Sequence, residues 1–104
     1  MIMKIQDYVN EGLEYVIDEM GEIRKTTYSD TYISIVFPNY RVASICVDEN
    51  KYSVAVCDYE GYFNWRTLDS FKKGDKNKSG AVICYSEDEV CNILEYVKGL
   101  GGEK

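Results

Sequence analysis

The stretch "TYISIVFPNYRVASICVDENKYSVAVC", residues 31–57, decides the fold class of this chain. It contains three runs of alternating side-chain character, at residues 31–37, 41–47 and 51–57. Short turns at residues 38–40 and 48–50 separate them, as is typical of an antiparallel meander. The glycine in "DYEGY", residues 58–62, predicts a further hairpin, and residues 62–68 return as a fourth strand. The run "AVICY", residues 81–85, predicts a last short strand.

Two helices are expected to flank this sheet. Residues 2–20 carry apolar side chains at spacings of three and four, which predicts a helix that ends at Gly21. These apolar residues are Ile5, Tyr8, Val9, Leu13, Val16, Ile17 and Met20. Ser86 and Glu89 form a capping-box pattern before a second apolar stripe, which predicts a C-terminal helix ended by glycines. We therefore expect one α+β domain over residues 1–104: a two-layer sandwich with an antiparallel sheet of four to five strands and both helices on one face.

Alternation assigns the sheet residues to two faces. The side chains expected to face the helices are Ile33, Ile35, Phe37, Ala43, Ile45, Val47, Val54 and Val56. The other face holds Tyr32, Ser34, Val36, Val42, Ser44, Cys46, Ser53, Ala55 and Cys57, a small set without charge. Since exposed sheet faces usually carry polar side chains, this face predicts a cover, supplied by a second copy, a partner protein or the chain's own loop.

The composition limits which kinds of partner and which cellular compartment are expected. Twelve basic and eighteen acidic residues give a net charge of -6, which disfavours direct binding to nucleic acid or to an anionic membrane. No apolar run is long enough to span a bilayer, and the N-terminus does not resemble a secretory signal, so a cytoplasmic protein is expected. The four cysteines form no CxxC or CxxH pair, and we expect buried free thiols and a reducing compartment.

The sequence offers little catalytic equipment. The chain has no histidine, which removes the usual Ser-His and Cys-His systems and the commonest metal ligand. The segment "GDKNKSG", residues 74–80, lacks the spacing of a phosphate-binding loop, and the calcium-loop pattern is also missing. We therefore expect no enzyme, no catalytic residue, no metal and no cofactor. A pocket for a small molecule between helices and sheet stays open as an alternative.

Candidate partner-binding residues lie in two places. Asp7, Glu11, Glu14 and Asp18 form a predicted acidic stripe along the first helix, without lysines to compensate it. Such a stripe suits a basic partner surface, and its alternative interpretation is a solvated face. Tyr59, Tyr62 and Arg66 surround the hairpin glycine and are expected to be displayed.

Phe63 and Trp65 alternate with Tyr62 and Arg66 and are expected in the core. Four lysines, Lys72, Lys73, Lys76 and Lys78, lie in a predicted polar loop at residues 69–80. This loop is expected to be flexible and solubilising, with contact to phosphates as the alternative.

These features predict a small cytoplasmic protein that binds and inhibits a protein target with a basic surface. In size, charge and α+β layout, the chain resembles phage-encoded antidefence proteins, anti-CRISPR proteins among them, and toxin-immunity proteins. That resemblance implies the blocking of a basic or nucleic-acid-binding target. A structural or regulatory homodimer, paired through the uncharged sheet face, is the alternative from a different class.

Overall fold

The structure of the chain is a computed structural model that describes residues 3–66, 75–76 and 81–100. Helices α1 (Ile5–Glu11) and α2 (Glu87–Gly99) begin and end the described chain. The strands are β1 (Tyr15–Ile17), β2 (Ile23–Lys25), β3 (Thr27–Tyr28), β4 (Tyr32–Val36), β5 (Val42–Asp48), β6 (Lys51–Tyr59), β7 (Phe63–Arg66), β8 (Asp75–Lys76) and β9 (Val82–Cys84). Of the predicted lysine loop, only β8 lies in the described residues, so the expectations for Lys72, Lys73 and Lys78 lie outside them.

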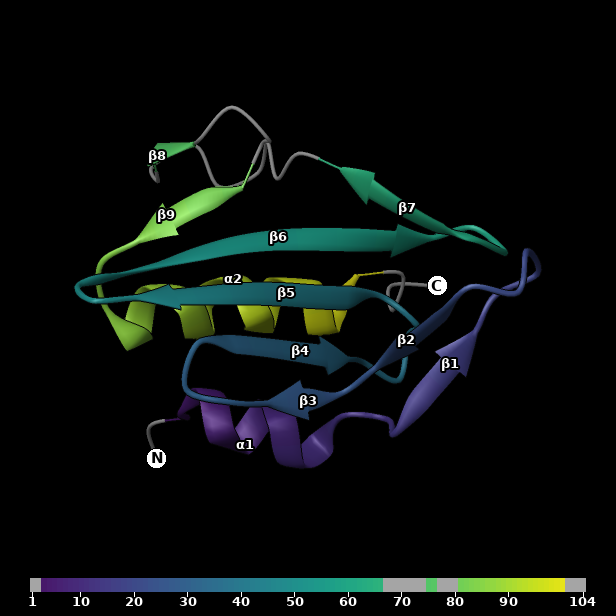
Figure 1. Cartoon of the computed structure of the whole chain (residues 1–104), viewed down its shortest axis with the longest axis horizontal. Coiled ribbons are helices and arrows are strands. Elements are labelled where there is room, and N and C mark those ends of the chain that lie inside the picture. Colours follow the sequence, from purple (N-terminus) through teal and green to yellow (C-terminus); the bar gives the residue numbers. More distant parts are fainter. Residues whose placement is uncertain (1–2, 67–74, 77–80, 101–104) are drawn as a thin grey trace.

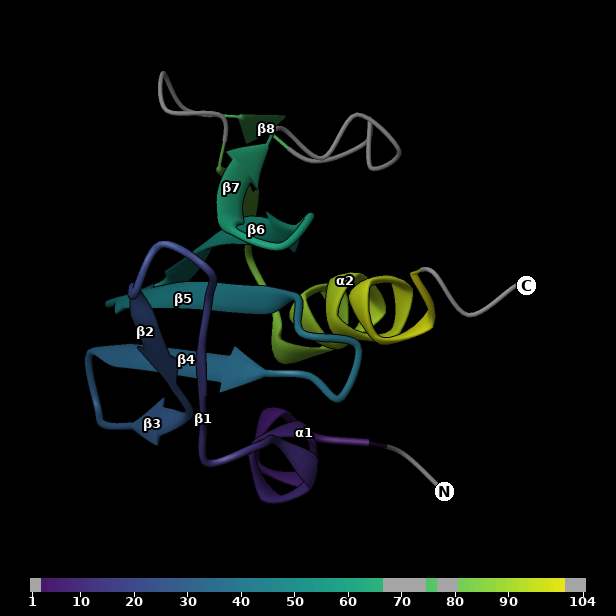
Figure 2. The ribbon, with the colours of Figure 1, turned by 90° about the vertical axis from the view of Figure 1, so that its right-hand side faces the viewer.

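The described strands form one large antiparallel sheet and a separate hairpin. The large sheet has seven strands in the order β3-β4-β5-β6-β9-β8, and β7 also pairs with β6. Strands β9 and β7 share one edge of β6, at residues 52–54 and 56–59 respectively. Both helices lie on one face of this sheet (Figures 1 and 2). The predicted α+β class and layering are confirmed, and the sheet is larger than expected because the two-residue strands β3 and β8 extend it.

The helix face of the sheet has the predicted composition. Register places Ile33, Ile45 and Val54 in one row across β4, β5 and β6, and Ile35, Ala43 and Val56 in another. These rows pack with the apolar sides of both helices into one buried cluster. Its other members are Ile5, Tyr8, Phe37, Val82, Cys84, Val90, Cys91, Ile93, Leu94 and Val97, with Val47 packed against it.

Helix α2 begins as its sequence predicts. The Ser86 hydroxyl accepts a hydrogen bond from the Glu89 N–H at 3.2 Å, which satisfies one of the first free backbone donors. The Glu89 carboxylate accepts from the Tyr85 N–H at 2.6 Å instead of from Ser86 itself. The N-cap is therefore confirmed, while the reciprocal half of the capping box is shifted by one residue.

The predicted N-terminal helix over residues 2–20 is wrong beyond Glu11. Helix α1 has seven residues, and the chain then turns through Gly12 into the β1–β2 hairpin. Ile5 and Tyr8 remain buried, and the Tyr8 hydroxyl donates to Glu95 Oε1 at 2.8 Å. Burial and this carboxylate raise the pKa of Tyr8 above its usual value. Packing of α1 against α2 is thus retained, although the helix is short.

The uncharged face of the sheet is covered over only part of its area. Val36, Val42 and Cys57 are fully buried and form a second cluster with Phe63. Leu13, Val16 and Tyr59 pack against this cluster. The chain's own hairpin and β7 therefore supply the cover here, one of the three predicted possibilities. The rest of the face, with Tyr32 and Cys46 exposed and Ser44, Ser53 and Ala55 half-buried, is the part to which the homodimer prediction still applies.

Candidate functional site

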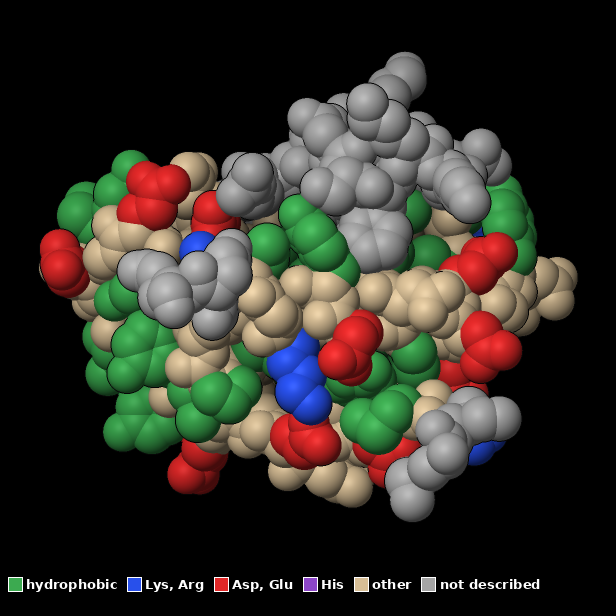
Figure 3. All heavy atoms as spheres, turned by 180° about the vertical axis from the view of Figure 1, so that it is seen from behind, with side chains coloured by type: hydrophobic (Ala, Val, Ile, Leu, Met, Phe, Trp, Pro, Cys, Tyr) green, Lys and Arg blue, Asp and Glu red, His purple; other side chains and the backbone are tan. Residues whose placement is uncertain are grey.

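The acidic stripe predicted along the first helix does not exist as one surface. Asp7 lies in the first turn of α1, where its carboxylate accepts from the Lys4 N–H at 2.8 Å. Glu11 forms an ion pair with Lys98 of α2, with 3.1 Å between Oε1 and Nζ. Glu14 is exposed just before β1, off the helix. Figure 3 shows this helix side of the molecule, on which acidic side chains are scattered and basic ones lie among them.

Asp18, the fourth member of that stripe, is a buried structural residue. Its side chain is 6 % exposed, and Oδ1 accepts from the N–H groups of Met20 and Glu22 at 2.9 and 2.8 Å. Oδ2 accepts from the Phe63 N–H at 3.0 Å. Burial favours the neutral carboxyl, but these backbone donors outweigh it and lower the pKa of Asp18. Asp18 therefore joins the β1–β2 turn to β7 and is unavailable to a partner.

The β1–β2 turn carries a sequence pattern that the helix interpretation overlooked. In "DEMGE", residues 18–22, the Gly21 N–H donates to the Asp18 carbonyl at 3.0 Å, and Gly21 has a φ of 86°. Aspartate first and a left-handed glycine fourth are typical of a three-residue hairpin loop. This pattern between "YVI" and "IRK" could have identified the hairpin.

A threonine hydroxyl forms hydrogen bonds that connect the base of the hairpin to the large sheet. Thr26 Oγ1 donates to the Leu13 carbonyl and accepts from the Val36 N–H at 3.0 Å. The Leu13 N–H donates to the Val36 carbonyl at 2.7 Å. A Cβ on Gly12 would lie 2.7 Å from the same hydroxyl, so glycine is required at this close approach. The hairpin thus leaves the sheet at a defined junction.

One face of the hairpin packs on the sheet. Val16 and Arg24 are opposite each other in the register and are both half-buried. The Arg24 guanidinium lies 5.9 Å from the centre of the Phe63 ring and forms an ion pair with Glu22. A cation over an aromatic face is attractive, more so when partly desolvated. Val16 and Arg24 therefore orient the hairpin so that its other face points away from the sheet.

That outward face is largely apolar and also carries the exposed Lys25, opposite Tyr15. Ile17 and Ile23 are opposite each other and are 52 % and 50 % exposed, and Tyr15 beside Ile17 is 53 % exposed. Met20, at the tip, is 81 % exposed. We call Tyr15, Ile17, Met20 and Ile23 the hairpin surface. Isolated exposed apolar side chains are common, whereas four on one short hairpin form a concentrated exposed patch, which makes the hairpin surface the candidate site.

Acidic groups surround the hairpin surface. Glu14, Glu19 and Glu22 are exposed, and residues 14–25 contain four acidic and two basic side chains. The Glu19 N–H donates to the Gly61 carbonyl at 2.9 Å, which joins the hairpin tip to the β6–β7 turn. Glu60 in that turn is also exposed. The local charge therefore favours a partner with basic groups around an apolar centre.

The predicted tyrosines lie at this same end of the molecule. Tyr62 follows Gly61 in the β6–β7 turn and is 44 % exposed. Tyr59 is half-buried, with edge-to-face contacts to Tyr40 and Phe63 at centroid separations of 5.2 and 5.4 Å. Phe63 is buried, as predicted, but on the hairpin side of the sheet. The backbones of Trp65 and Arg66 pair with Cys57 and Val56, while the predictions for their side chains lie outside what is described.

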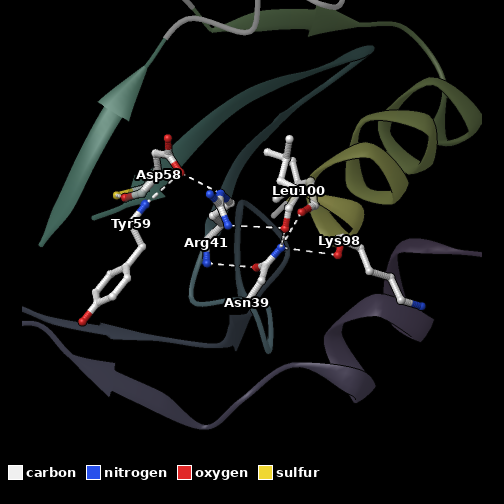
Figure 4. A network of polar contacts seen from close by, with 8 residues as sticks. Asn39, Arg41, Asp58, Tyr59, Lys98 and Leu100 are labelled. Atoms are coloured by element: carbon white, nitrogen blue, oxygen red, sulfur yellow. Dashed lines mark hydrogen bonds and ion pairs between the residues drawn. The ribbon is translucent and has the colours of Figure 1, made fainter. Parts of the chain in front are cut away.

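A polar network next to Tyr59 is structural (Figure 4). The Asn39 amide donates to the Val97 and Leu100 carbonyls at 2.8 and 3.0 Å, which satisfies the C-terminal end of α2. The Arg41 Nε lies 2.6 Å from Asp58 Oδ1, and both groups are largely buried. Asn39 and Arg41 thus hold the β4–β5 turn, helix α2 and β6 together.

The cysteines show no paired or metal-binding arrangement. All four are free, and Cys57, Cys84 and Cys91 are buried, as expected. Cys46 is exposed, which corrects the expectation for that residue, because its side of the sheet is uncovered there. Burial raises the pKa of the Cys57 and Cys84 thiols to about 11, which keeps them protonated and unreactive near neutrality. Within the described ranges, His, Cys, Asp and Glu side chains form no metal-binding group.

Neither helix of the described chain is long and apolar enough to cross a bilayer. The structure brings Glu14, Tyr62 and the supporting residues Asp18 and Tyr59 to one end of the molecule, and leaves Asp7 and Glu11 on α1. The exposed Tyr15, Ile17, Met20 and Ile23 were missed as site residues because they were assigned to a helix. No protein-family model matches the chain, and no curated protein and no solved structure is significantly similar to it.

Proposed function

We propose that this protein acts by binding another protein through the hairpin surface. The observation that carries the proposal is the outward, largely apolar face of the β1–β2 hairpin, with Met20 81 % exposed at its tip. The bound partner has an apolar patch surrounded by lysines or arginines, which face Glu14, Glu19 and Glu22. The acidic groups proposed here lie on and around the hairpin, in place of the predicted stripe along the first helix. The expected partner is still a protein with a basic surface.

The energy available at this surface suits specific binding. Tyr15, Ile17 and Ile23 each have about half of their side-chain area left to bury. At about 25 cal/mol per Å², burial of that half contributes on the order of 1 kcal/mol for each side chain, and more for Met20. Acidic groups at the border add long-range attraction, which increases the association rate more than the affinity.

Inhibition is the specific form of this proposal. A small domain that occupies the basic surface of a target blocks whatever else that surface binds. Antidefence proteins of phages and toxin-immunity proteins act on targets in this manner, and the size and charge of this chain suit such a role. The genomic neighbourhood of the gene distinguishes the two, since a prophage and a toxin operon are different settings.

The test compares variants as bait in lysate of the native host, at low and high salt. Ile17→Thr with Ile23→Thr removes apolar contact while it keeps β-branched side chains and charge. Tyr28→Thr is the matched control, since Tyr28 is 53 % exposed on β3, outside the hairpin surface. Glu14→Gln with Glu19→Gln tests the acidic border separately.

The proposal expects a stoichiometric partner with a basic surface that binds the wild type and the Tyr28 variant. With that partner purified, calorimetry should show affinity reduced about 30- to 100-fold in the double isoleucine variant. The double glutamine variant should show a weaker dependence on salt. A partner held equally well by the double isoleucine variant, an acidic partner, or recovery of the protein alone contradicts the proposal.

A further inference from the structure

The outer edge of β1 carries backbone groups that no described strand pairs. Hydrogen bonds between β1 and β2 alternate, and the bonds from Asp18 N to Glu22 O and from Thr26 N to Glu14 O identify the bonded pairs. Tyr15 and Ile17 are therefore in the non-bonded pairs of the hairpin. Their N–H and C=O groups point away from β2, along the outer edge of β1.

This edge lies on the outside of the molecule. In the described part of the chain, β1 pairs with β2 alone. On either side of it, the Leu13 N–H donates to the Val36 carbonyl and the Glu19 N–H donates to the Gly61 carbonyl, and the outer backbone groups of Tyr15 and Ile17 lie between these two contacts. Figure 1 shows β2 between β1 and the body of the large sheet, with β1 on the outer side. Proteins commonly block exposed edges with lysine, proline or a bulge. The edge of β1 has none of these at Tyr15, Val16 or Ile17.

We infer that the partner of the hairpin surface adds an extended segment to β1 as a further strand. This inference rests on the proposed function and specifies how the partner binds. The N–H and C=O groups of Tyr15 and Ile17 pair with the backbone of the segment, in the manner of β-strand addition. Alternate apolar side chains of the segment lie beside Tyr15 and Ile17, on the outward face. Lysines or arginines at its ends lie near Glu14 and Glu19.

Charge decides between a partner segment and a second copy of this chain. Antiparallel pairing of two β1 strands about Val16 places the exposed Glu14 of each copy next to the exposed Glu19 of the other. Like charges at the ends of a short strand pair destabilise it. A basic extended segment meets the same carboxylates with attraction. The inferred occupant is therefore a basic, alternating segment of a different protein.

The first experiment uses a synthetic peptide of alternating lysine and valine, KVKVKVK, with isotope-labelled wild-type protein. NMR titration should shift resonances of β1, and hydrogen exchange at the Tyr15 and Ile17 amides should slow. The amides of Ile23 and Lys25, on the opposite edge, should be unchanged. The peptide EVEVEVE should produce none of these effects. Shifts that are absent, that lie on the β2 edge, or that both peptides produce overturn the inference.

The second experiment removes one backbone donor without changing a side chain. Native ligation at Cys46 joins a synthetic segment of residues 1–45, N-methylated at Ile17, to residues 46–104. Methylation of Ile23 is the matched control, because its N–H lies on the opposite edge of the same hairpin. The Ile17 derivative should bind KVKVKVK at least 10-fold more weakly, while the Ile23 derivative stays within 2-fold.

Equal affinities of the two derivatives overturn strand addition at β1. A different result contradicts the proposed function: a captured partner that binds the Ile17→Thr, Ile23→Thr variant with the same affinity as the wild type. If the side-chain variant loses the partner and the N-methyl derivative keeps it, the hairpin surface stands and strand addition does not. If N-methylation disturbs folding, hydrogen exchange at the Tyr15 and Ile17 amides of the unmodified protein still tests strand addition.

Discussion

The two faces of the large sheet are covered in different ways. On one face, α1 and α2 close a single extended cluster of buried side chains, distributed over both helices and the four strands β4, β5, β6 and β9. On the other face, the β1–β2 hairpin covers a cluster that has four buried members among the described residues, with three more packed against it. Among the described residues, the hairpin is hydrogen-bonded to the rest through Asp18, Thr26 and the backbone bonds at Leu13 and Glu19. Stability is therefore concentrated on the helix face, while the hairpin surface lies on the element that covers the smaller described cluster.

The largest effect is expected on the helix face. Leu94→Ala removes a fully buried side chain of α2 and leaves a cavity among side chains of both layers. Substitutions of this kind reduce the free energy of unfolding by about 2–5 kcal/mol. Urea denaturation measures the loss, and Asn92→Ala, at an exposed position of the same helix, should change it by less than about 0.5 kcal/mol. A loss below about 1 kcal/mol for Leu94→Ala would mean that this cluster is less well packed than the structure indicates.

An intermediate effect is expected at the base of the hairpin. Thr26→Val keeps the shape of the side chain but leaves the Leu13 carbonyl and the Val36 N–H without the hydroxyl. Loss of such partners costs about 1–3 kcal/mol. Hydrogen exchange should accelerate at Val16 and Arg24 before it does on the helix face. Thr27→Val, at the exposed next residue, is the control, and uniform acceleration over both faces would contradict a separately attached hairpin.

Asp18 should make the attachment of the hairpin sensitive to pH. Its folded-state pKa lies below the ordinary value of 3.8, so its contribution is present above that pH and is lost as the pH falls through the folded pKa. Asp18→Asn leaves one acceptor oxygen and places an amide donor opposite a backbone N–H. The variant should be less stable than the wild type at pH 7, and the difference should shrink towards pH 3. Asp30→Asn, at an exposed aspartate, should show no such convergence in urea denaturation.

The same contrast explains which parts the sequence could predict. Residues 31–57 alternate because one face packs on helices, and α2 has its own cap and apolar stripe, so local patterns suffice for both. In residues 12–20, Leu13, Val16, Ile17 and Met20 fit helical spacing, yet Leu13 and Val16 pack on Val36 and Val42, which come much later in the chain. The local turn pattern at residues 18–22 could have corrected the helix. The cover over Val36 and Val42, and with it the hairpin surface, depends on contacts that no local pattern encodes.

The smallest effect on stability is expected at the hairpin surface itself. Ile17→Thr with Ile23→Thr changes two side chains that are half exposed and that lie outside both buried clusters. Threonine keeps the strand preference of isoleucine, so the free energy of unfolding should change by less than about 0.5–1 kcal/mol in urea denaturation. In the double isoleucine variant, affinity for the partner should fall far more than the free energy of unfolding. Leu94→Ala should instead lower the free energy of unfolding, and should reduce binding only because less of the protein is folded. A double variant that unfolds as readily as Leu94→Ala would show that these isoleucines belong to the core of the protein, and the two faces would then no longer differ in the way proposed.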